Sequence, residues 1–183
     1  GTSTSTDFTL PLTITISAGI QSASVTLQAT SDDPLDEFDE TVIIDMACDA
    51  TCSEATTQQR TVTIVDETAL PTVALAVGVG LINEKTGATS TAVTVTLSAA
   101  SAKGVTITLT TTGTAVTPTD YTLNATTIAI PAGSTVGSVT LTAKNDDPLD
   151  EVDETVIIDM VCDAACNEAT LQQRTVTIKD ETA

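Results

Sequence analysis

Asp-Asp-Pro-Leu-Asp-Glu-Val-Asp-Glu-Thr-Val-Ile-Ile, residues 146–158, joins a run of acidic residues to an aliphatic one. Residues 32–44 repeat this stretch, with Phe38 in place of Val152 as the single difference. Carboxylates at this density repel one another unless a cation or a basic partner lies among them. Basic partners are scarce, because the chain has 6 Lys and Arg against 25 Asp and Glu, no His, and a formal net charge of −19.

The composition indicates a globular protein and excludes several kinds of partner. A chain this acidic is a poor match for the phosphates of nucleic acid. Apolar residues make up 41% of the chain and aromatic residues 2%, which favours an aliphatic core over disorder. No apolar run reaches about 18 residues, so we expect no membrane insertion in this segment. No signal-peptide pattern follows Gly1, and we interpret the chain as a processed or excised piece.

The repeat extends beyond the acidic stretch at a spacing of 114 residues, which also relates Gly19 to Gly133. Repetition at this length indicates tandem domains rather than a solenoid of short units. We expect a complete domain over 70–183. The other copy, over 1–69, is expected to be incomplete, because it lacks every counterpart of Pro71–Gly113.

The incomplete copy has two explanations that the sequence leaves open. The chain is either a slice of a longer array of repeats or a subunit whose first domain is completed by a different chain. Since it holds two C-terminal halves and one N-terminal half, strand exchange among identical chains would leave one half unmatched. Half a sandwich alone would expose strand edges that promote aggregation.

The local pattern predicts strands throughout. Aliphatic residues alternate with Thr in runs such as Ala92-Val93-Thr94-Val95-Thr96-Leu97, the period of a sheet with one buried and one solvated face. Gly, Pro and Asn separate these runs at turns. We predict an all-β, antiparallel, Ig-like sandwich with about seven strands in the complete domain. The expected strands are 72–77, 91–98, 104–111, 126–130, 136–144, 154–161 and 170–179.

Several short motifs occur in a fixed order along 70–183 and, in part, along 7–69. They are Asp120-Tyr121, Ile130-Pro131-Ala132-Gly133, Val139-Thr140-Leu141, Asp146-Asp147 with Glu151-Val152-Asp153-Glu154-Thr155-Val156, and Thr175-Val176-Thr177-Ile178 with Asp180. This ordered set resembles the Calx-β domain, a β-sandwich found in sodium–calcium exchangers and in arrays of large bacterial surface proteins. The resemblance implies a Calx-β type of sandwich in tandem copies.

In Calx-β domains that bind calcium, acids from several loops hold the ions at one tip of the sandwich. For 70–183 the resemblance implies the ligands Glu84, Asp120, Asp146, Asp147, Glu151, Glu154, Asp180 and Glu181. For 1–69 it implies Asp7, Asp32, Asp33, Glu37, Glu40, Asp66 and Glu67. No counterpart of Glu84 exists there, so we expect a weaker site. Lys85, and an exit with fewer acids than in well-studied members, lead us to expect roughly one to three ions per complete domain.

The residue types support calcium independently of the resemblance. Calcium takes six to eight oxygen ligands in flexible geometry, and carboxylates from separate loops supply them. With no His and two Cys in each repeat, a zinc or copper site is poorly provided for. The alternative is that these acids are solvated charge on loops, as charged runs usually are.

The four cysteines form two pairs with the same spacing, Cys48 with Cys52 and Cys162 with Cys166. A pair four residues apart at a hairpin end can bring its Cα atoms within disulfide distance. Two local bridges would use every cysteine and suit an oxidising compartment, outside the cell or at its surface. The alternative is two free thiols in each loop.

These observations favour a structural function over an enzymatic one. The chain has no His for general base catalysis, no Gly-x-Ser-x-Gly motif, and few aromatic residues for a sugar site. We expect a calcium-binding module of a large extracellular repeat protein, an adhesin or a surface fibre. Its partners would be calcium ions and neighbouring repeats of the same or another chain.

The joint between the copies suggests how calcium would act. Residues 66–71, Asp-Glu-Thr-Ala-Leu-Pro, leave little slack, so calcium at Asp66 and Glu67 is expected to stiffen the array. Two alternatives belong to other classes: a ligand-binding adhesion module, and a fibre subunit whose incomplete first domain accepts strands from another chain.

Overall fold

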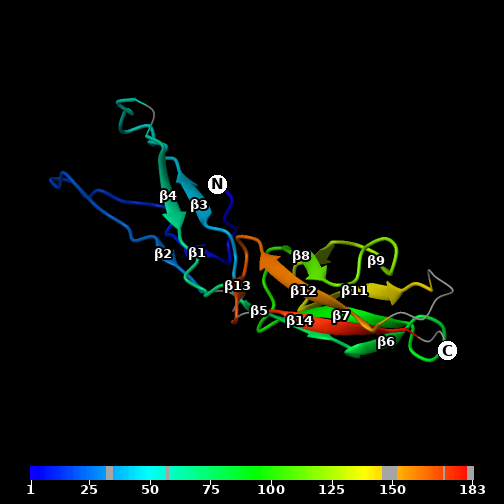
Figure 1. The fold of residues 1–183 in the computed structure, drawn as a ribbon. Helices are drawn as coiled ribbons and strands as arrows, with labels where there is room; N and C mark the ends of the chain where they lie inside the picture. Colours follow the sequence, from blue (N-terminus) through cyan, green and yellow to red (C-terminus); the bar gives the residue numbers. More distant parts are fainter. Residues whose placement is uncertain (32–34, 57, 146–151, 171, 181–183) are drawn as a thin grey trace. The chain divides into compact units, whose positions relative to one another are not determined.

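The computed structural model shows a chain built of β-strands joined by turns and loops (Figure 1). It describes residues 1–31, 35–56, 58–145, 152–170 and 172–180, and no helix occurs within these ranges. The chain divides into two compact units, Gly1–Thr68 and Ala69–Ala183, called here the first and the second unit. The predicted all-β class is confirmed.

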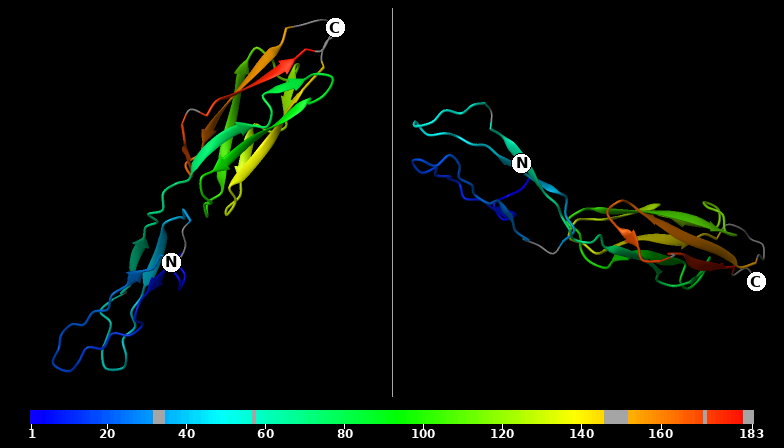
Figure 2. Two further views of the ribbon diagram at one scale, coloured as in Figure 1. Left: turned by 90° about the horizontal axis from the view of Figure 1, so that it is seen from below. Right: turned by 90° about the vertical axis from the view of Figure 1, so that its left-hand side faces the viewer.

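The second unit is a sandwich of two five-stranded sheets, whose layers Figure 2 shows from two sides. One sheet has the order β10-β8-β12-β14-β6 and the other β13-β5-β7-β11-β9. The strands are β5 (Thr72–Val77), β6 (Leu81–Asn83), β7 (Ser90–Leu97), β8 (Val105–Gly113), β9 (Tyr121–Leu123), β10 (Thr127–Ile130), β11 (Val136–Ala143), β12 (Glu154–Cys162), β13 (Asn167–Glu168) and β14 (Arg174–Lys179). The predicted sandwich is confirmed.

Alternation along each strand builds the core between these sheets. In β7, Val93 and Val95 are fully buried while Thr94 and Thr96 face outward. The same pattern in β8 buries Ile107. Burying about 25 cal/mol per Å² of apolar surface stabilises the fold, and β-branched residues suit both faces of a pleated sheet. The aliphatic-rich composition therefore supplies a complete core with almost no aromatic residues.

All seven predicted strands are present, and three short ones join them. The additional strands β6, β9 and β13 have two or three residues each, too few to show an alternating pattern. Pairing is antiparallel except where β6 runs parallel to β14 and β13 runs parallel to β5. The predicted strand at 170–179 begins only at Arg174.

The chain crosses from one sheet to the other between β5 and β6. Gly78 still pairs with the sheet that contains β5 and β7, because its amide donates to the Ala92 carbonyl at 2.9 Å. Gly80 already pairs with the sheet that contains β14 and β6, since its carbonyl accepts the Thr177 amide at 2.8 Å. Strands that switch sheets in this way form the corners of sandwiches. The crossing carries Glu84 to the end of β14.

The first unit contains two antiparallel pairs of strands. β1 (Phe8–Thr9) pairs with β2 (Gln28–Ala29), and β3 (Glu40–Ile44) pairs with β4 (Arg60–Ile64). Glu40 lies opposite Ile64, as Glu154 lies opposite Ile178 in the second unit. Among the described residues of the first unit, Val42 is the one buried aliphatic side chain.

No helix within the described ranges is long and apolar enough to span a membrane.

Candidate metal centre

The first unit contains a cleft of about 700 Å³ whose lining gathers many of the predicted calcium ligands. Five of them line it: Asp7, Glu37, Glu40, Asp66 and Glu67. They come from the loop before β1, the segment leading into β3, and the residues after β4. The fold therefore brings together acids that lie up to 60 residues apart in the sequence.

Asp7 is the most tightly held of these acids. It is buried, and its Oδ2 atom accepts a short hydrogen bond from the Thr4 amide. Its Oδ1 atom accepts the hydroxyls of Thr4 at 3.0 Å and Thr6 at 2.9 Å. The Thr4 amide in particular lowers the pKa of Asp7 to about 2, against the opposing effect of burial. Asp7 is therefore ionised throughout the physiological pH range.

Glu40 lines the same cleft as Asp7. Ionised carboxylates gathered in one cleft repel one another, which favours the uptake of a proton or a cation. A divalent cation can be bound by carboxylate oxygens from several such residues at once. These gathered carboxylates are the feature of the cleft that points to a metal ion.

Asp66 is also held in place in the cleft. Its Oδ2 atom accepts the Glu37 amide at 2.6 Å, and its Oδ1 atom accepts the Thr68 amide at 2.8 Å. The Asp66 amide donates to Asp39 Oδ1 at 3.2 Å. These bonds tie the segment before β3 to the residues after β4, so the cleft has a defined frame.

The second unit places three predicted ligands at one end of the sandwich, on neighbouring strands. Glu154 begins β12, opposite the buried Ile178 of β14. Side chains alternate along strands, so Asp180, two residues beyond Ile178, shares its core-facing side. Glu84 likewise follows the buried Ile82 by two residues, and its amide lies 3.4 Å from the Lys179 carbonyl. All three acids are half-buried.

Asp120 approaches the same end from the loop after β8. Its Oδ2 atom accepts the Val116 amide at 2.5 Å, as Asp7 accepts the Thr4 amide in the first unit. The Ala115 amide of this loop donates to the Thr155 carbonyl at 3.1 Å, one residue from Glu154. Asp120 and Glu154 therefore come from adjacent segments of backbone.

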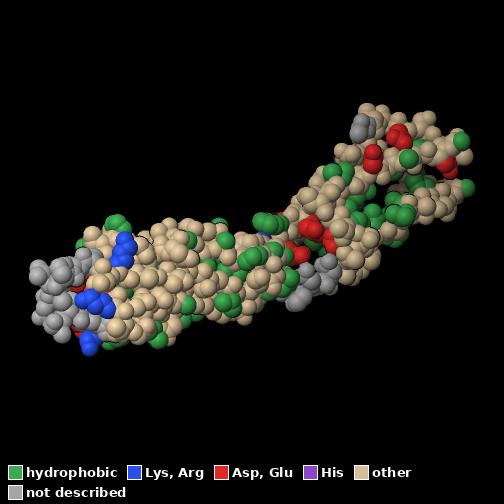
Figure 3. Space-filling model, turned by 90° about the vertical axis from the view of Figure 1, so that its right-hand side faces the viewer, with side chains coloured by type: hydrophobic (Ala, Val, Ile, Leu, Met, Phe, Trp, Pro, Cys, Tyr) green, Lys and Arg blue, Asp and Glu red, His purple; other side chains and the backbone are tan. Residues whose placement is uncertain are grey.

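Lysines also occupy this end of the second unit. The Lys144 amide donates to the Asp120 carbonyl at 2.8 Å, and its Nζ atom donates to the Pro118 carbonyl at 2.6 Å. Lys179 ends β14, and Lys85 follows Glu84. Figure 3 shows basic side chains gathered at this end. The first unit has Arg60 as its one basic residue, so the two candidate centres differ in charge.

Part of the predicted site lies outside the described residues. These positions are Asp32, Asp33, Asp146, Asp147, Glu151 and Glu181. Sequence reasoning in turn missed Thr4 and Thr6, whose hydroxyls hold Asp7, and Asp39, which receives the Asp66 amide. Asp39 belongs to the acidic run, so the sequence could have identified it as part of the site. Nothing in the sequence distinguishes Thr4 and Thr6, because Thr is abundant throughout the chain.

Both predicted disulfides are present. Cys48 bonds to Cys52 and Cys162 to Cys166, with Cα atoms 5.8 Å and 6.0 Å apart. The sulfur atoms of Cys162 and Cys166 lie near Asp163, but a metal would need thiolates, which a disulfide does not offer. We therefore assign no metal to the cysteine loops.

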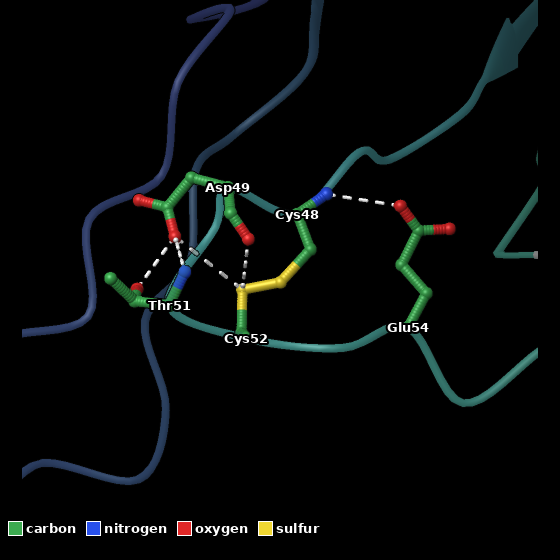
Figure 4. Close-up of a disulfide and its surroundings, with 5 residues drawn as sticks. All are labelled: Cys48, Asp49, Thr51, Cys52 and Glu54. Atoms are coloured by element: carbon green, nitrogen blue, oxygen red, sulfur yellow. Dashed lines mark hydrogen bonds between the residues drawn. A yellow bond between two sulfur atoms is a disulfide. The ribbon is translucent and has the colours of Figure 1, made fainter.

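Figure 4 shows the loop of the first bridge. Asp49 Oδ1 accepts the hydroxyl of Thr51 at 2.6 Å and its amide at 2.8 Å, which lowers the pKa of Asp49, with the hydroxyl as the larger cause. Glu54 accepts the Cys48 amide at 3.0 Å. Each acid is thus held by its own loop.

Comparison with known proteins identifies the type of fold. The chain is similar to the crystal structure of the apo form of the Calx CBD1 domain, with 19% identity, a TM-score of 0.50, and coverage of 62% of this chain and 99% of that one. The fold is therefore Calx-β-like.

Two structures of CBD12 are also similar to this chain. They are the calcium binding domain CBD12 of CALX1.1, at 20% identity and a TM-score of 0.49, and CBD12 from CALX1.2, at 22% and 0.48. The matches cover 60% and 56% of this chain, and less than half of each CBD12 chain, 44% and 41%. No family model and no curated protein matches the sequence.

The donor set fits calcium on its own chemistry. The cleft of the first unit offers carboxylate, hydroxyl and carbonyl oxygens and no nitrogen or sulfur ligand. Calcium accepts such oxygen donors in variable number, mono- or bidentate, whereas zinc and copper prefer imidazole and thiolate.

Proposed function

We propose that this protein is a calcium-binding structural module of a large extracellular repeat protein, such as an adhesin or a surface fibre. The observation that carries the proposal is the cleft of the first unit, which is lined by five carboxylates from three separate segments, those of Asp7, Glu37, Glu40, Asp66 and Glu67. The Calx-β-like fold of the second unit and the calcium binding domain named in one similar structure support it.

In this proposal calcium stabilises each unit by cross-linking segments that the sequence keeps apart. In the first unit the ion would join Asp7, Glu40 and Asp66, which come from three separate segments. In the second unit Glu84, Glu154 and Asp180 would be joined at the ends of three neighbouring strands. Without the ion, the same carboxylates repel one another and favour opening of the strand ends.

The same binding would stiffen the array. Asp66 and Glu67 stand directly before residues 68–71, so an ion held there would leave a very short free link. Two disulfides suit an oxidising, extracellular location. Calcium modules outside cells have dissociation constants of roughly 10⁻⁴–10⁻³ M, so millimolar calcium would occupy them.

Thermal unfolding of the full chain with stepwise addition of calcium tests the proposal. At ten times the dissociation constant one site adds about 1.4 kcal/mol to the stability of the unit that holds it. We expect a rise in melting temperature of about 5–10 °C per occupied unit. Magnesium, which demands stricter octahedral geometry and sheds water reluctantly, should give a much smaller rise.

The double variant Glu37→Gln with Glu40→Gln identifies the site. It should lose the calcium-dependent rise of the first unit. The matched control, Asp45→Asn with Glu168→Gln, removes the same formal charge at exposed positions outside the cleft and should keep it. If calcium leaves the melting curve of the parent protein unchanged, these acids are solvated charge on loops and the protein is a spacer domain.

A further inference from the structure

The acidic ends of the two units share most of their carboxylates and differ in their cations. At the repeat spacing of 114 residues, Lys144 of the second unit corresponds to Thr30 of the first. Lys179 corresponds in the same way to Val65, and this is the one difference between residues 174–183 and their counterparts. The second unit therefore carries two positive charges that the first unit lacks, close in sequence to acids that both units possess.

The structure places Lys144 and Thr30 in the same backbone setting. The Lys144 amide donates to the Asp120 carbonyl at 2.8 Å, and the Thr30 amide donates to the Asp7 carbonyl at the same distance. Lys144 directly follows β11, as Thr30 directly follows β2. The presence of Lys in place of Thr thus puts an ammonium group beside the loop that carries a predicted ligand.

The Lys144 side chain also holds the loop that carries Asp120. Its Nζ atom donates to the carbonyl of Pro118, two residues before Asp120, at 2.6 Å. This loop is one residue longer than its counterpart, since Thr114–Asp120 has seven residues where Thr2–Asp7 has six. The second unit therefore has both the lysine and a longer loop that the lysine binds.

Lys179 brings a second ammonium group to the same end of the sandwich. It is exposed at the end of β14, and its carbonyl lies 3.4 Å from the Glu84 amide. Glu154 begins β12, which pairs with β14, and Asp180 directly follows Lys179. These three acids are half-buried, so the repulsion among them is screened less by salt than it would be at fully exposed positions.

We propose that Lys144 and Lys179 are built-in counter-charges for the acidic end of the second unit. They reduce the repulsion among its carboxylates when no calcium is bound. They also oppose the approach of a divalent cation, so this end has a lower affinity for calcium than the same acids would have without them. The lower affinity for calcium rests on the proposed function, whereas the stabilisation of the calcium-free unit does not.

Thermal unfolding of the full chain in chelator tests the counter-charges without calcium. The variant Lys144→Thr with Lys179→Val gives the second unit the residues of the first. Tyr121, the single tyrosine, is buried in the second unit and reports its unfolding. We expect the variant to melt about 3–8 °C below the parent. This gap should narrow as sodium chloride is raised to about 1 M, where the Debye length is about 3 Å.

Displacement of terbium by calcium measures the affinity of this end. Terbium takes oxygen ligands as calcium does, and its luminescence is excited through a nearby tyrosine. Tyr121 directly follows Asp120, and the first unit has no tyrosine, so the signal reports the second unit. The double variant should need about three- to tenfold less calcium for half-displacement, because two positive charges near a divalent ion are removed.

Single variants separate the charge of Lys144 from its hydrogen bond. Lys144→Arg keeps the charge and should behave like the parent in both measurements. Lys144→Gln keeps a donor without the charge and should bind calcium as tightly as Lys144→Thr does. Lys103→Thr removes the same charge next to the opposite end of β8 and should leave the calcium affinity unchanged.

A lower melting temperature in chelator, together with tighter calcium binding by the double variant, supports the counter-charges. Equal melting curves and equal half-displacement for parent and double variant overturn them. They are also overturned if Lys144→Gln matches the parent in both measurements, because the hydrogen bond alone then explains the lysine. If calcium displaces no terbium from any of these proteins, calcium binding by this unit fails, and the melting curves in chelator decide whether the lysines stabilise it.

Discussion

At the scale of single residues, the chemistry of the site depends on how each carboxylate is held. The short loop before β1 surrounds Asp7 with an amide and two hydroxyls, and this loop keeps the acid charged although it is buried. An ionised acid fixed in advance loses little entropy when it binds a cation. Asp7 is therefore the residue around which the cleft of the first unit is organised.

The low pKa of Asp7 predicts a pH dependence of stability. Its ordinary value is 3.8 and its value in the folded protein is about 2. A carboxyl group whose pKa is lower in the folded than in the unfolded protein stabilises the folded state at pH values above its unfolded pKa. This stabilisation is lost as the pH falls from about 3.8 to about 2. The Asp7→Asn variant lacks this pH-dependent stabilisation. The unfolding midpoints of the variant and the parent should therefore converge as the pH falls from about 3.8 to about 2.

Chemical denaturation without calcium at a series of pH values measures this convergence. The control is Glu67→Gln, which lies in the same cleft and should retain the pH-dependent stabilisation that Asp7 supplies. A gap between parent and Asp7→Asn that stayed constant from pH 5 to pH 2 would contradict the assignment.

At the scale of the strand, the comparison of β3 with β12 shows what a missing neighbour changes. Both strands begin with Glu-Thr-Val-Ile-Ile, and β3 pairs with β4 in the same register as β12 pairs with β14. β12 has β8 on its other edge and runs to Cys162, whereas β3 ends at Ile44. Local sequence thus starts the strand, and pairing on the second edge determines its length.

This difference predicts unequal costs for the same substitution in the two units. Met160→Ala removes a fully buried side chain and should cost about 2–5 kcal/mol. Met46→Ala removes a half-exposed one and should cost within about 0.5 kcal/mol. Urea denaturation measures both. The fluorescence of Tyr121, the single tyrosine of the chain, reports on the second unit, and hydrogen exchange of β3 reports on the first.

Val161→Ala is the control, because Val161 neighbours Met160 but is exposed. It should behave like Met46→Ala. Equal costs for Met46→Ala and Met160→Ala would mean that the first unit already buries this face in solution.

At the scale of the whole molecule, the large negative charge is the main influence on how compact the calcium-free chain can be. A net charge of −19 on 183 residues raises the free energy of any compact, calcium-free state, and salt relieves this only by screening. Calcium neutralises the same charges at fixed points. We therefore expect the dimensions of the chain in solution to depend on calcium and much less on ionic strength.

Small-angle X-ray scattering measures this effect. Calcium at a few millimolar should give a longer maximum dimension and a narrower distribution of distances than chelator does. Sodium chloride at matched ionic strength should not reproduce the change. The Glu37→Gln, Glu40→Gln variant should show a reduced response. The same extension in calcium and in chelator would contradict the stiffening of the array.

Much of the fold was predictable because its signals are local. The alternation of aliphatic residues with Thr identified seven strands, and the Cys spacing predicted both bridges. The short strand β6 was not predicted, because three residues are too few to show an alternating pattern. The predicted ligands at 146, 147, 151 and 181 lie outside the described residues and stay a prediction.

The sequence by itself determined the repeat, the strand pattern and the density of acids, because each is a property of neighbouring residues. Only the tertiary structure decided which acids meet and which aliphatic residues are buried. Asp7 and Glu40 line one cleft because β3 and the loop before β1 bond to one another at Thr41, a contact between residues about 40 apart in sequence. Met46 and Met160 share a sequence context and differ in burial, because burial depends on strands that only one unit possesses.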